Sequence, residues 1–63
     1  MAKYTFEPKD SEKETFEEFG IPAEVVVITE YNKYDAWNLL SKRLNKKEGL
    51  IRKLFKHTLT SYS

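Results

Sequence analysis

The sequence contains no cysteine, only two glycines, and no long hydrophobic run. Without cysteine the chain can form neither a disulfide bond nor a cysteine-ligated zinc site. Two glycines are too few for a glycine-rich phosphate-binding loop. The longest apolar run, Val25–Ile28, is far too short to span a membrane, and residues 1–10 lack the apolar segment of a signal peptide. We therefore expect a cytoplasmic protein without a membrane segment.

The chain is also short, at 63 residues, which allows one domain, residues 1–63. A domain of this size buries only about 60% of the surface that its unfolded chain exposes, so its stability is marginal. Hydrophobic residues make up 40% of the sequence and aromatic residues 14%, which favours a folded core over disorder. Because no disulfide can help, we expect a tightly packed core or a partner chain, and we predict a homodimer.

A large excess of one charge is missing as well, since the formal net charge is +1, but the two halves of the chain differ. Residues 1–31 carry three basic against eight acidic residues, a net charge of −5. Residues 32–63 carry eight basic against two acidic residues, a net charge of +6. This asymmetry bears on partners rather than on fold. Either the halves attract each other in a compact monomer or dimer, or the basic half has a functional face.

Two segments of the acidic half have strand patterns. Residues 3–7 alternate Tyr4 and Phe6 with polar residues, which predicts a short, half-buried strand. Residues 24–31 contain the four β-branched residues Val25–Ile28, which favour an extended backbone. Unbroken apolarity predicts that this strand is covered on both faces, or is covered on one face and paired with a second copy on the other.

Residues 11–19, between these strands, predict a helix. Ser11 and Glu14 have capping-box spacing, and Gly20 stands where a helix-ending glycine belongs. A second hairpin strand is the alternative, because the segment is short and its phenylalanines also suit a strand.

From residue 34 onward the apolar period becomes helical. Asn32 or Asp35 is the candidate cap for this region. A break near residues 45–49 is indicated by Asn45 and Gly49, which are poor residues inside a helix. The alternative is one continuous helix. The apolar stripe consists of Trp37, Leu40, Leu44, Leu50, Ile51, Leu54, Phe55, Leu59 and Tyr62. The fold class that follows is α+β, with a small sheet of two or three short strands and a C-terminal helical hairpin packed on it.

The stretch Leu39–His57 holds seven of the eleven Lys and Arg residues. It resembles a helix-turn-helix unit, in which two short helices cross at a tight turn. The matching positions are Leu40 and Leu44 inward on the first helix, Ser41 at the contact, Asn45 in the turn, and Ile51 and Leu54 inward on the second helix. The stretch departs from the pattern at Lys46, where an apolar residue is usual, and in lacking a third helix just upstream.

The resemblance implies a second helix in the major groove of duplex DNA. Its outward face would consist of Lys47, Gly49, Arg52, Lys53 and Lys56, with Lys42, Arg43 and Lys46 on phosphates. The layout also resembles ribbon-helix-helix dimers, in which paired strands read DNA. Val25–Ile28 argues against that reading, because a strand that reads bases must project polar side chains.

Other interpretations of the same residues stay open. Basic residues opposite an apolar stripe also form an ordinary solvated face, Trp37 is expected in the core, and His57 is expected on the surface. No catalytic triad or metal-ligand spacing is present, so we expect no enzyme, cofactor or metal. The prediction is a small nucleic-acid-binding regulator. The alternative is an interaction or inhibitor protein that binds a larger protein through its acidic half or the loop of Tyr31 and Tyr34.

Overall fold

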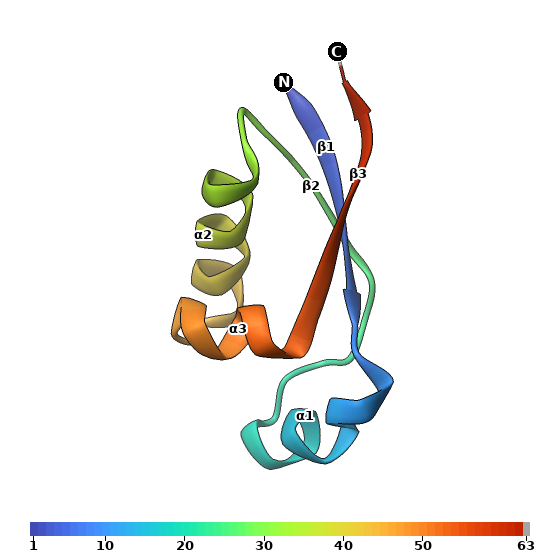
Figure 1. Cartoon of the computed structure of the whole chain (residues 1–63). Helices are drawn as coiled ribbons and strands as arrows, with labels where there is room; N and C mark the ends of the chain where they lie inside the picture. Colours follow the sequence, from blue (N-terminus) through green and yellow to red (C-terminus); the bar gives the residue numbers. More distant parts are fainter. Residues whose placement is uncertain (63) are drawn as a thin grey trace.

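The computed structural model describes residues 1–62, which form a three-stranded antiparallel sheet with α2 (Lys33–Leu44) and α3 (Glu48–Leu54) on one face (Figure 1). The strand order is β2-β1-β3, so the first strand lies in the centre. In chain order the elements are β1 (Ala2–Pro8), the 3-10 helix η1 (Asp10–Glu12), α1 (Lys13–Phe19), β2 (Val26–Glu30), α2 (Lys33–Leu44), α3 (Glu48–Leu54) and β3 (Phe55–Tyr62). Figure 1 shows α1 at the end of the sheet opposite the two chain termini.

The alternation of apolar and polar residues in β1 determines which face of the sheet is buried. Ala2, Tyr4 and Phe6 are buried on the face that carries the helices. On the same face, Tyr4 lies opposite Ile28 of β2, and Phe6 lies opposite His57 of β3. The odd-numbered residues of β1 therefore lie on the open face, which none of the described helices covers.

Aromatic and aliphatic side chains from every layer form the core. The ring of Trp37 in α2 packs edge-on against Phe6, with the ring centres 4.7 Å apart. The ring of Phe16 in α1 packs edge-on against Phe55, with the ring centres 5.2 Å apart. The largest fully buried side chains are Phe6, Phe55, Ile28, Leu40, Ile51 and Leu54. The expectation that Trp37 belongs to the core is confirmed, because this residue is only 5% exposed.

Asn32, one of the two candidate caps, begins α2. Its side-chain oxygen accepts a hydrogen bond of 2.9 Å from the backbone N–H of Asp35. We expect Asn32→Ala to cost about 1 kcal/mol, which lowers the melting temperature of a domain this small by about 4–8 °C. Asn38→Ala, at an exposed position inside the same helix, is the matched control and should be neutral or slightly stabilising in thermal denaturation. Equal melting temperatures for the two variants would contradict the capping role.

The predicted C-terminal helical hairpin is wrong. Residues 55–62 form β3, which pairs with β1 and ends the described chain. The helical pattern misleads because Phe55 and Leu59, four residues apart, share one face of a helix and also one face of a strand. Thr58 and Thr60 favour the strand, and pairing with the central strand decides between the two.

Of the other predictions for the helices, some are confirmed and some are wrong. The break between two helices is confirmed, since α2 ends at Leu44 and α3 begins at Glu48, so the continuous helix is wrong. Residues 11–19 are helical rather than a strand, but no side chain within residues 1–62 caps α1, so the predicted capping box is absent from this helix.

The prediction that β2 is covered on both faces is also wrong. Its inward side chain Ile28 is buried, but Val27 on the open face is 50% exposed. The helices cover only one face of the sheet, so an apolar side chain of β2 that points the other way meets no second layer.

Candidate nucleic-acid interface

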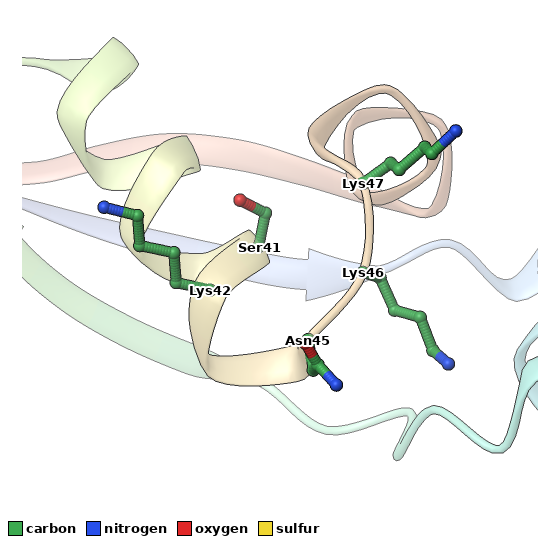
Figure 2. Close-up of a pocket in the computed structure, with 5 residues that line it drawn as sticks. All are labelled: Ser41, Lys42, Asn45, Lys46 and Lys47. Carbon is green, nitrogen blue, oxygen red and sulfur yellow. The ribbon is translucent and has the colours of Figure 1, made fainter.

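Three of the predicted nucleic-acid-binding lysines lie together where α2 meets α3: two that were expected on phosphates and one, Lys47, that was expected on the outward face of the second helix. Lys42, Lys46 and Lys47 line a shallow hollow of about 330 Å³ together with Ser41 and Asn45 (Figure 2). We call these five residues the basic corner. In the part of the chain that the structure describes, no acidic residue lines this hollow.

The local sequence explains why the chain turns at the basic corner. Asn45 takes a left-handed conformation with φ of 55°, which asparagine tolerates better than most residues. The backbone N–H of Lys46 then donates to the carbonyl of Ser41 over 3.1 Å. Ser41 is buried, and its hydroxyl donates to the carbonyl of Asn38 over 2.8 Å. The hydroxyl of this small buried residue is therefore satisfied within α2.

The lysine side chains of the basic corner spread apart. Figure 2 shows the amino group of Lys42 pointing away from those of Lys46 and Lys47, which themselves point in different directions. Three ammonium groups that diverge cannot enclose one small anion. They are suited to separate charges on an extended polyanion, because each amine is a mobile point charge on a flexible stem.

Arg52, the predicted base-reading residue, is engaged within the protein. Its guanidinium forms a 3.2 Å ion pair with Glu48, one turn earlier in α3. The guanidinium also lies 5.8 Å from the ring centre of Tyr34 and 5.9 Å from that of Trp37, within the range of a cation–π interaction. The i,i+4 spacing reveals the ion pair in the sequence, but the contact with α2 depends on how the helices cross.

The remaining predicted site residues do not join the basic corner. Arg43 in α2 and Lys53 in α3 are exposed and do not line the hollow. Lys56 was expected on the outward face of the second helix, and this placement is wrong. It lies in β3 opposite Glu7 on the open face of the sheet, with its amino group 3.9 Å from the carboxylate. The seven predicted residues therefore do not share one helical surface.

The remaining candidate residues, the two loop tyrosines and the one histidine, lie on the surface. Tyr31 and Tyr34 are exposed at the start of α2, and the amino group of Lys33 lies 5.3 Å from the ring centre of Tyr34. His57 is exposed, as expected, and its ring lies 5.7 Å from that of Trp37. Within residues 1–62 no three His, Cys, Asp or Glu side chains are grouped to hold a metal ion.

Comparison with known proteins adds no family. No protein-family model matches the chain, and no curated protein or solved structure matches it at a significant level. Over residues 1–62, no helix has the length and apolarity needed to cross a membrane.

Proposed function

We propose that this protein is a small regulator that binds duplex nucleic acid through the phosphate backbone, using the basic corner. The observation that supports the proposal is the arrangement of Lys42, Lys46 and Lys47 around a hollow whose lining contains no carboxylate. Phosphates repeat along both strands of a duplex, so diverging lysines can each reach a different one. The proposal includes a cytoplasmic location, which suits a chain without cysteine.

Binding through the basic corner should depend little on base sequence. Phosphate contacts position a protein on the duplex but carry no sequence information themselves. Base reading needs polar side chains free to reach into a groove. Arg52 is held by Glu48 and by the ring of Tyr34, so it is poorly placed for that task. We therefore propose a backbone binder of low sequence preference rather than a reader of one operator.

A titration of the wild-type protein against random duplex DNA at increasing salt tests this function. Three neutralised phosphates predict that log K falls with log salt with a slope of about −3, since each contributes about −0.9. Affinity should then drop about 40-fold between 50 and 200 mM salt. Failure to bind duplex DNA at low salt, where electrostatic attraction is strongest, would overturn the proposal.

The alternative is a non-enzymatic protein that binds or inhibits a larger protein. The exposed rings of Tyr31 and Tyr34 favour it, because aromatic side chains are enriched in protein interfaces. The two candidates use different residues, so the titration separates them. A protein that ignores duplex DNA at every salt concentration would leave this second function as the one that the exposed surface supports.

A further inference from the structure

The two edges of the sheet differ in how well they are protected against pairing with another strand. Free strand edges expose unpaired backbone groups, and natural proteins blunt them with lysine, proline or a β-bulge. The edge strand β3 has two of these devices. It carries Lys56, and its register with β1 shifts between Lys3 and Tyr4, which are paired with Ser61 and Leu59. The extra residue between those partners, Thr60, makes a bulge.

The edge strand β2 has none of these protections. The residues Val26–Glu30 include no lysine or proline, and they pair with β1 in unbroken register. Among the backbone hydrogen bonds within residues 1–62 that lie outside the helices and strands, none involves residues 24–31. The outer backbone groups of β2 are thus available to a further strand.

Exposed apolar side chains lie along this free edge and at its two ends. Val25 is 61% exposed, Val27 is 50% exposed, and Tyr31, which directly follows the strand, is 73% exposed. Alternation along β2 puts Val27 on the open face, while Val25 and Tyr31 flank the strand at its two ends. A bare strand edge next to exposed apolar residues is the usual surface for strand addition.

The β-branched residues of β2 let the strand pair with a second copy of itself, and the charges at its two ends select one register. Two antiparallel copies of β2 in one continuous sheet can be centred on Val27, Ile28 or Thr29. Centring on Val27 places Glu24 opposite Glu30 of the second copy, twice, and like charges directly opposite are destabilising.

Centring on Ile28 removes this repulsion. Each Val27 then lies opposite Thr29 of the second copy on the open face. A cross-strand pair of two β-branched residues is favourable. Centring on Thr29 would instead place Val25 against Lys33, the first residue of α2. The Ile28 register is the one that pairs all of Val26–Glu30 without facing like charges.

We propose that two copies of the chain associate through antiparallel pairing of β2, centred on Ile28, to form one six-stranded sheet with both sets of helices on the same face. The strand is short, so the interface lies at the small end of the range for specific complexes. We expect a dimer that dissociates in the micromolar range. The proposal is independent of nucleic-acid binding, because it uses no residue of the basic corner.

Sedimentation equilibrium over a micromolar concentration series is the first test. Wild type should pass from monomer to dimer. Val27→Glu with Thr29→Glu should remain monomeric, because each introduced carboxylate faces another across the pair. Val27→Lys with Thr29→Lys should also remain monomeric, whereas mixing the two variants should restore a dimer. The matched control, Thr58→Glu with Ser61→Glu, adds the same charge to the open face of β3 and should dimerise like wild type. A wild-type monomer throughout the series would overturn the proposal.

Disulfide trapping tests the register, and the absence of native cysteine makes it clean. Opposite residues have Cα atoms about 4.5–5.5 Å apart, within reach of a disulfide bond. A Val27→Cys chain mixed with a Thr29→Cys chain, with oxidised glutathione as oxidant, should give mainly the mixed disulfide. A dominant Val27→Cys homodimer would indicate centring on Val27, and a dominant Thr29→Cys homodimer would indicate centring on Thr29. Either result would overturn the proposed register, and no cross-link at a concentration that gives the wild-type dimer would overturn pairing through β2.

Discussion

Replacing Trp37 by alanine is expected to cost about 3–5 kcal/mol, because the substitution leaves a large cavity in the core. The indole is 5% exposed and packs against the ring of Phe6, so it joins α2 to the central strand. At roughly 0.05–0.15 kcal/mol per residue, a 63-residue chain has a total stability of about 3–9 kcal/mol. The variant should therefore melt far below wild type or lose its cooperative thermal transition altogether, as measured by circular dichroism.

Two further variants make this result interpretable. Tyr62→Ala removes a ring that is 74% exposed, so its free energy of unfolding should stay within about 0.5 kcal/mol of wild type. Trp37→Phe keeps an aromatic ring in the core and should fold with an intermediate loss of stability. If Trp37→Ala instead melts like wild type and loses only ligand binding, Trp37 is a recognition residue and its assignment to the core is wrong.

Local signals in the sequence predict several features of the fold correctly. Trp37 belongs to the core, Asn32 caps α2, and Asn45 adopts the left-handed conformation that ends this helix. Each of these follows from the chemistry of one side chain and its near neighbours. The capping side chain reaches a backbone N–H only three residues away, and the helix break needs a residue that tolerates positive φ.

Features that depend on contacts between distant parts of the chain could not be predicted from local sequence. The strand β3 exists because residues 55–62 pair with residues 2–8, more than 45 positions earlier. The apolar spacing of Phe55 and Leu59 allows either a helix or a strand, and only the partner strand decides. Propensity is a weak guide where tertiary pairing competes with it.

The candidate site was also predictable only in part, where local sequence determines it. The sequence locates the positive charge in the second half of the chain, but treating residues 39–57 as two helices spreads seven basic residues over one surface. In the structure the strand β3 moves Lys56 to the open face of the sheet, beside Glu7. The crossing of α2 and α3 brings the guanidinium of Arg52 near Tyr34. Neither placement has a local signal, so the smaller basic corner emerges only from the fold.

Removing the three lysines of the basic corner should nearly abolish nucleic-acid binding. The variant combines Lys42→Ala, Lys46→Ala and Lys47→Ala. Each neutralised phosphate contributes about −0.9 to the slope of log K against log salt, so the slope should flatten by nearly three units. None of the three side chains belongs to the hydrophobic core, so the melting temperature should change little. Fluorescence anisotropy with labelled duplex DNA at several salt concentrations measures the loss.

A control of equal charge decides whether the loss belongs to the basic corner or to net charge. The control variant removes an equal number of positive charges from the acidic half of the chain, by combining Lys3→Ala, Lys9→Ala and Lys13→Ala. If binding depended only on net charge, both triple variants would lose the same affinity, and that result would remove the basic corner from the proposal.

The variant Arg52→Ala tests whether Arg52 contributes to base recognition. Because the guanidinium of Arg52 is paired with Glu48, the Arg52→Ala variant should bind every duplex sequence with the affinity of wild type. A loss of about 1–3 kcal/mol confined to particular base pairs would show instead that Arg52 leaves its ion pair to read a base.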